Sequence, residues 1–289
     1  MSMNLFHSVK QALSNLDPQE VRDQADRPVR IGLHAASEAA YAEMERFLVP
    51  AYVSDARRME LRGAIARAAN GQTYDIDIFS PELSTPPQGF YFSSPNPERT
   101  VRDILTRRAD LALPLARTIC PFREPVARRI ISKISKENAL FSVATAVPDI
   151  VPLLSLPWAI GEFASDTAFI TANQFRMAFF LAAASDRPIG YKEQKGEVAS
   201  MILGAFGWRA LARELVGHIP FGGGLIPKAA IAYAGTRVVG MSIERYYRIG
   251  YGYTREERRV AFEQALQRGK TIANTMVAGF KRNRFIPSS

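Results

Sequence analysis

The residues that could do chemistry in this chain are scattered, and none completes a motif. A phosphate-binding loop needs a glycine-rich turn between a strand and a helix, followed by a lysine and a hydroxyl that hold phosphate and magnesium. After the apolar run 29–33 the chain reads His34-Ala35-Ala36-Ser37-Glu38, which contains none of these parts. Gly269-Lys270-Thr271 matches only the end of the motif, because Gln264 stands in place of the leading glycine. The three histidines lack metal-ligand spacing. We therefore predict no catalytic residues, no metal and no cofactor.

A second group of candidates consists of charged residues inside apolar sequence, namely Asp149, Asp166 and Arg176. Charges within an apolar body usually pair with one another, because an unpaired charge there is costly. Glu162 and Asp166 are also four residues apart, a spacing that on a helix suits acid–base work or cation binding. Ordinary charges at helix ends are the commoner origin of such a pair. We favour a structural role over a catalytic one for the buried charges.

The apolar sequence around these charges is long enough to suggest contact with a membrane. Residues 139–161 contain a single charge, and as a helix they would cross a hydrocarbon core of ~30 Å. Pro148, Pro152 and Pro157 argue against a straight, lipid-exposed span. Residues 167–185 form a second apolar stretch. A membrane hairpin and a helical hairpin inside a soluble bundle both fit this pattern, and the two interpretations stay open.

Basic residues flank the two apolar stretches. An amphipathic helix that opens at Pro125 places Arg129, Lys133 and Lys136 on one side, directly before the first stretch. Acidic residues lie between the stretches and a basic segment follows the second, as expected for a hairpin with both ends in the cytoplasm. The membrane-contact candidates are therefore these three basic residues and Trp158 of the first stretch.

Hydrophobic periodicity divides the chain into a small α/β head and a mainly helical body. In the head it predicts strands at 29–33, 74–78 and 89–92, helices at 3–16, from Ser37 and at 54–70, and a polar linker at 17–28. Asn96 followed by Pro97 then starts the first helix of the body. The predicted fold class is α+β, with a head over residues 1–95 and a mainly α-helical body over residues 96–289.

Small residues recur every four positions near the end of the body. Ala232, Thr236 and Gly240 would share one face of a helix. Small side chains at this spacing let two helices approach closely. We therefore expect this helix to pack tightly against another, either within the chain or across a homo-oligomer.

Charge is distributed unevenly along the chain, whose formal net charge is +9. Residues 1–100 carry ten basic and thirteen acidic side chains, whereas residues 201–289 carry fourteen basic and five acidic ones. Such a basic region suits an anionic partner. The anion-contact candidates are Arg245, Arg248, Arg255, Arg258 and Arg259. Nucleic acid is the weaker choice of partner, because four glutamates dilute this basic region.

Several features of the body occur in an order that resembles a known family. These features are Pro148, Asp166, Gln174, Met177, a helix at 208–215, Ile219-Pro220, Gly222-Gly223-Gly224 and the run 229–240. Over about residues 140–250 the chain resembles the YcjF-type domain of unknown function, which occurs in bacteria beside Era-like GTPases and on its own. The resemblance implies a helical, often membrane-associated module, and it makes a GTPase on another chain a candidate partner. It implies no reaction.

Two classes of function follow from these observations. The first is a non-enzymatic, membrane-associated interaction module that contacts a membrane surface and a GTPase or other protein. The alternative is a soluble helical protein that binds an acidic partner or nucleic acid through its basic tail. A single cysteine and the absence of a secretory signal at the start of the sequence suit the cytoplasm. We expect a cytoplasmic location, with association to the inner membrane under the first hypothesis.

Overall fold

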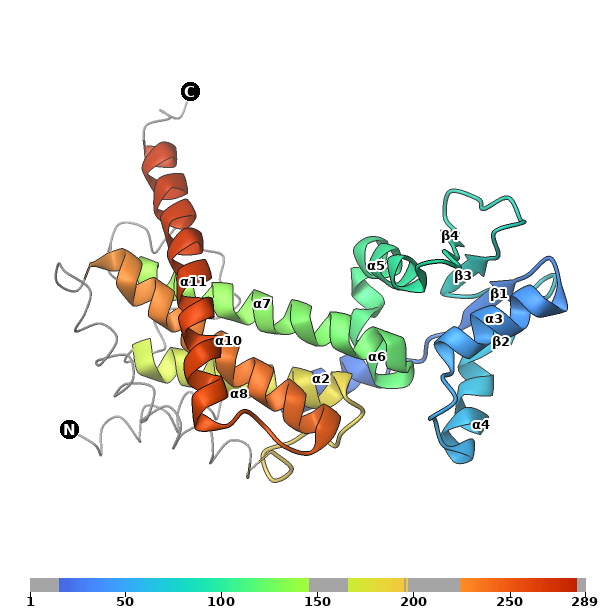
Figure 1. Cartoon of the computed structure of the whole chain (residues 1–289), viewed down its shortest axis with the longest axis horizontal. Helices are drawn as coiled ribbons and strands as arrows, with labels where there is room; N and C mark the ends of the chain where they lie inside the picture. The colour runs from blue at the N-terminus through green and yellow to red at the C-terminus, as the bar shows by residue number, and fades with distance from the viewer. Residues whose placement is uncertain (1–15, 146–165, 195, 197–223, 285–289) are drawn as a thin grey trace. The chain divides into compact units, whose positions relative to one another are not determined.

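The computed structural model describes residues 16–145, 166–194, 196 and 224–284 of the chain (Figure 1). The fold of these residues is α+β, a small parallel sheet followed by a mainly helical body, and it confirms the predicted class. The chain divides into two compact units. Residues 19–128 and 182–188 form the head unit, and the other described residues form the body unit. The boundary predicted from the sequence was residue 95.

The sheet of the head unit has the strand order β2-β1-β3-β4, and each neighbouring pair is parallel. Its strands are β1 (Ile31–His34), β2 (Ile65–Arg67), β3 (Ile76–Phe79) and β4 (Phe90–Tyr91). Alternation along β1 and β3 places Leu33 and Ile78 on the buried face of the sheet. β1, β3 and β4 overlap the three strands that the alternating pattern predicts.

Strand β2 was missed, because its residues were assigned to a helix over 54–70. Helix α4 (Asp55–Ala64) ends earlier, and the chain enters the sheet at Ile65. Ile65 is buried and pairs with Ile31 of β1. Pairing and burial in the sheet therefore outweigh the local helical pattern, which is common for short strands.

The other helices of the head unit include one in a segment that was predicted to be a linker. Helix α2 (Pro18–Ala25) occupies most of the predicted linker 17–28, because Val21 and Ala25 are buried. Helix α3 (Glu38–Leu48) begins as predicted, with the Ser37 hydroxyl accepting a hydrogen bond from the backbone N–H of Ala40 at 3.1 Å. The remaining elements before the body are α5 (Pro97–Arg107), the 3-10 helix η1 (Ala109–Leu111) and α6 (Ala112–Thr118).

Long helices make up the rest of the described chain. They are α7 (Cys120–Ala144), α8 (Asp166–Ala184), α10 (Leu225–Ile249) and α11 (Arg255–Arg284). Helix α7 begins five residues before Pro125, so the prediction that this proline opens the helix was wrong. Pro121 lies in the first turn of α7, where a missing N–H removes no helical hydrogen bond, whereas Pro125 lies inside the helix and removes one.

The core of the body unit is apolar and closely packed. Phe141 of α7 stacks on Phe169 of α8, with ring centroids 3.7 Å apart. Gly269 of α11 lies so close to α10 that a Cβ atom would stand 2.8 Å from the carbonyl oxygen of Ala230. Among the described helices, none is long and apolar enough to cross a membrane.

Some predictions concern residues outside the described part of the chain. They are the helix at 3–16, Asp149, Trp158, Glu162, the helix near 208–215 and the glycine run 222–224. Asp166 begins α8, but its side chain is also outside the described part.

Candidate functional site

The exposed face of α7 carries the predicted basic residues. Arg129, Lys133 and Lys136 are spaced by four and three residues, which places them on one side of the helix. All three are exposed, whereas Ile131 and Ile134 are buried. In the described part of the chain, Lys133 and Lys136 form no ion pair. We call Arg129, Lys133 and Lys136 the basic face.

A shallow pocket of about 430 Å³ lies along the basic face. Its lining residues are Arg129, Ser132, Lys133, Lys136, Glu137, Leu140 and Met276. Met276 comes from α11, and its position is fixed by an apolar cluster that joins Ala139 and Val143 of α7 to Ala273 of α11. The pocket therefore combines several cations, a hydroxyl and apolar atoms on a well-packed support.

Glu137 is the acidic residue of this lining, and its charge is neutralised by Arg176 of α8. Its Oε2 atom accepts hydrogen bonds from Nη1 of Arg176 at 3.1 Å and from Nδ2 of Asn173 at 3.3 Å. The side chains of Glu137 and Arg176 are only 14% and 15% exposed. A partly buried ion pair of this kind offsets the charge of Glu137 beside Lys133 and Lys136.

A buried polar network continues from this ion pair through three helices. Asn173 of α8 donates from Nδ2 to Oδ1 of Asn138 on α7 at 2.8 Å, and Asn138 donates to the Thr236 hydroxyl of α10 at 2.7 Å. All three residues are buried. The network satisfies polar groups that would be costly to bury alone, and so fixes how the helices meet.

Of the predicted buried charges, only the Arg176 side chain lies in the described part of the chain. The partner that the structure shows for Arg176 is Glu137, which the sequence analysis did not single out. The position of Glu137 in the sequence could have predicted its inward orientation. Glu137 lies three residues after the buried Ile134, on the inward side of an otherwise exposed basic segment.

Two of the predicted small residues of α10, Thr236 and Gly240, lie where α10 meets other helices of the same chain. Thr236 and Gly240 are buried, and Ala232 is half-buried. A Cβ atom on Gly240 would stand 2.8 Å from Cγ1 of Ile131 and 2.8 Å from Sδ of Met177. Glycine is therefore the residue that allows this approach.

The predicted anion-contact arginines lie around the turn between α10 and α11, and three of them form ion pairs within the chain. Their partners are Glu257 for Arg245 at 2.7 Å, Glu244 for Arg248 at 3.0 Å, and Glu256 and Glu263 for Arg259 at 2.7 and 3.1 Å. Arg258 donates to the carbonyl oxygen of Thr254 at 3.3 Å, and Arg255 is exposed. The glutamates therefore neutralise much of this basic region.

Glu257 has a second role in this turn. Its carboxylate accepts a hydrogen bond from the backbone N–H of Thr254, and its own N–H donates to the Thr254 hydroxyl. This reciprocal pair caps the start of α11. The Thr254 N–H and the Arg245 guanidinium lower the pKa of Glu257, so it stays ionised beside Arg245. The guanidinium also lies over the rings of Tyr251 and Tyr253, 5.1 Å from each centroid. Arg245 thus stabilises the turn.

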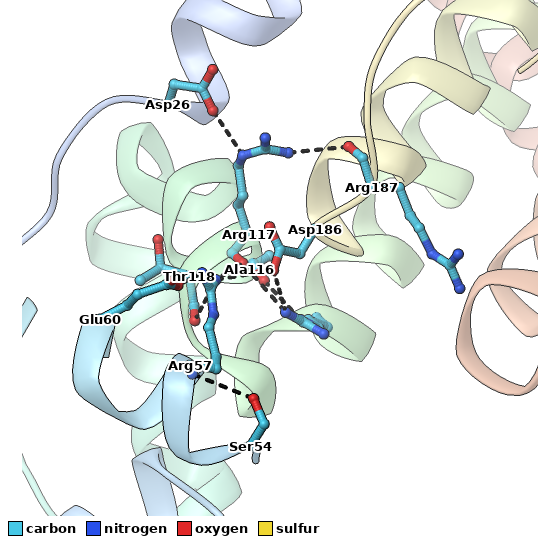
Figure 2. Close-up of polar contacts among 10 residues, drawn as sticks. Asp26, Ser54, Arg57, Glu60, Ala116, Arg117, Thr118, Asp186 and Arg187 are labelled. Carbon is cyan, nitrogen blue, oxygen red and sulfur yellow. Dashed lines mark hydrogen bonds and ion pairs between the residues drawn. The ribbon is translucent and has the colours of Figure 1, made fainter. Parts of the chain in front are cut away.

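The head unit contains a cluster of arginines around the last turn of α6 (Figure 2). Arg57 of α4 donates from Nη2 to the carbonyl oxygens of Arg117 at 3.0 Å and Thr118 at 3.3 Å. Arg123 of α7 donates from Nε to the carbonyl oxygen of Ala116 at 3.3 Å. The last carbonyls of a helix have no partner inside the helix, and cations are favourable there.

The same cluster includes the segment after α8, which belongs to the head unit. Asp186 adopts a left-handed backbone conformation, with φ of 56°, and its Oδ2 atom lies 3.1 Å from Nη2 of Arg57 and 3.4 Å from Nη2 of Arg123. Arg117 pairs with Asp26 at 2.7 Å and donates to the carbonyl oxygen of Arg187 at 3.2 Å (Figure 2). These guanidinium groups are engaged by the protein itself, so we assign the cluster a structural role.

One histidine, at the carboxyl end of β1, meets one aspartate of β3. Nε2 of His34 on β1 lies 2.7 Å from Oδ1 of Asp77 on β3, and the imidazole stacks on Phe79 with centroids 4.1 Å apart. Such a pair could orient a general base, but the contacts described for these two side chains include no Ser, Thr or Cys side chain. In that same part of the chain, no group of three His, Cys, Asp or Glu residues could hold a metal ion.

The fold and this geometry define an α+β chain whose body presents a basic helix face. No protein-family model, curated protein or solved structure matches the chain. The resemblance to the YcjF-type domain therefore stays a prediction.

Proposed function

We propose that the chain is a non-enzymatic binding module that associates peripherally with an anionic membrane surface through the basic face of α7. The observation that carries this proposal is the exposure of Lys133 and Lys136 on a rigid helix without ion-pair partners among the described residues. The module would act at the cytoplasmic side of the inner membrane.

The expected strength of this attraction follows from simple electrostatics. Each Lys or Arg near an anionic bilayer contributes ~1 kcal/mol, so the two lysines together contribute ~2 kcal/mol, or about thirtyfold in membrane partition. Arg129 adds to this attraction on the same helix side. Glu137 opposes it little, because Arg176 compensates its charge.

The basic tail supports the alternative function less well. Arg245, Arg248 and Arg259 already pair with glutamates of the same chain, so an acidic partner or a nucleic acid would have to displace them. A GTPase or other protein partner, and self-association, stay predictions from the sequence.

Vesicle flotation with charge-matched variants tests the proposal. The wild-type protein should float with vesicles that contain phosphatidylglycerol at low salt, and should remain below vesicles of phosphatidylcholine. Lys133→Glu/Lys136→Glu should lose at least about thirtyfold in binding. Arg255→Glu/Arg258→Glu carries the same change in charge on the tail and should retain binding. If only the tail variant loses binding, the tail is the contact; if neither loses it, the basic face has no such role.

A further inference from the structure

The pocket along the basic face changes character from one end to the other. Arg129 to Lys136 covers seven residues, or ~10 Å of helix. Leu140 lies one turn further along α7, and Met276 of α11, which packs against the cluster that contains Ala139 and Val143, completes the lining. The pocket is therefore cationic at one end and apolar at the other.

The cationic end also has the groups that a phosphate needs. Lys133 and Lys136 offer ammonium donors, and Ser132, one residue before Lys133, offers a hydroxyl in the same lining. Glu137 would repel an anion if its charge were uncompensated, but it accepts from Arg176 and Asn173. The volume of about 430 Å³ lies within the range of small-ligand sites, roughly 300–1,000 Å³.

We propose that this pocket binds the phosphate of a single phospholipid, with the start of an acyl chain on Leu140 and Met276. This inference rests on the proposed function and goes further, because it assigns a stoichiometric head-group site in place of diffuse attraction to charge. The shared chemistry is a phosphate ester or free phosphate beside an apolar surface. The order of charges and apolar atoms along α7 sets the orientation of the lipid.

Titration of the full chain with a soluble short-chain lipid tests the site. The probes are dihexanoyl-phosphatidylglycerol below its micelle concentration, inorganic phosphate, and dihexanoylglycerol without phosphate, each followed by calorimetry. The phosphatidylglycerol should bind saturably at one site. Lys133→Ala/Lys136→Ala should abolish this binding. Met276→Asn, which keeps all charges, should weaken it at least about fivefold. Thr275→Ala, an exposed neighbour on α11, is the control and should bind as the wild type does.

The remaining outcomes separate this inference from the proposed function. If vesicles bind but the short-chain lipid does not bind saturably, the head-group site is wrong and surface attraction stands. If inorganic phosphate binds as tightly and Met276→Asn has no effect, the site takes a free anion and the lipid assignment is overturned. If neither vesicles nor short-chain lipid bind, both proposals fail. Circular dichroism of each variant shows whether a loss reflects unfolding.

Discussion

Gly240 gives the sharpest test of how the body helices pack. A Cβ atom there would stand 2.8 Å from both Ile131 and Met177, and these side chains are 2% and 0% exposed, so neither can move into solvent. Gly240→Ala should therefore cost ~1–3 kcal/mol by overpacking. The same change gains about 1 kcal/mol in helix propensity, so the net loss of stability is ~0–2 kcal/mol. Gly235→Ala in the same helix has no heavy atom within 4 Å of the new Cβ, so this change should only raise the free energy of unfolding.

The comparison of the two variants isolates the overpacking. Both replace a glycine inside α10, so the propensity gain cancels, and Gly235→Ala should exceed Gly240→Ala in unfolding free energy by ~1–3 kcal/mol. Urea denaturation followed by circular dichroism measures this difference if the slopes agree. Equal midpoints would refute the close approach at Gly240. Sedimentation of both variants shows whether the face also joins two chains, because only then would Gly240→Ala lower the mass.

Three further predictions test other parts of the structure. The purified protein should not bind GTP or ATP, and saturable micromolar binding in calorimetry would contradict the motif argument. Asn138→Leu should lower the urea midpoint by an amount equivalent to ~1–3 kcal/mol, because Thr236 and Asn173 lose their buried partner; an unchanged midpoint would argue against the network. Burial raises the pKa of Tyr191 to about 12, and its hydroxyl donates to the carbonyl oxygen of Leu16 at 2.8 Å. In the unfolded chain this phenol has its ordinary pKa of 10.0, so it ionises at a lower pH than in the folded protein. The free energy of unfolding should therefore fall between pH 10 and 12, and it should fall less in Tyr191→Phe.

The parts of the fold that could be predicted are those in which local pattern and final environment agree. The alternation around Ile76 predicted β3, and Ser37 predicted the start of α3, because a half-buried strand and a capped helix leave direct marks in sequence. The sequences of β2 and α2 contain no such local pattern. Ile65 is in a strand because β1 lies beside it, and Val21 is buried by residues that the local sequence does not identify.

The candidate site was predictable in its exposed half only. The spacing of Lys133 and Lys136 revealed a basic helix side, since exposed charges at helical intervals need no knowledge of the rest of the fold. The Met276 side of the pocket lies more than a hundred residues further along the chain. Likewise, the pairing of Arg176 with Glu137 depends on which helices meet, and no local pattern contains that information.

The apolar sequence of α8 illustrates why composition alone could not separate membrane from core. Lipid tails and a protein interior are both apolar, so the informative residues are the polar ones inside the stretch. The side chains of Asn173 and Arg176 donate hydrogen bonds to residues of α7. These two polar groups of α8 therefore have partners within the body unit. The membrane association that we propose therefore relies on the charges of α7 and not on the apolar sequence of α8. Electrostatic attraction to the membrane weakens as salt shortens the Debye length, from ~30 Å at 0.01 M to ~8 Å at 0.15 M. Membrane binding by insertion of apolar side chains would not weaken in this way.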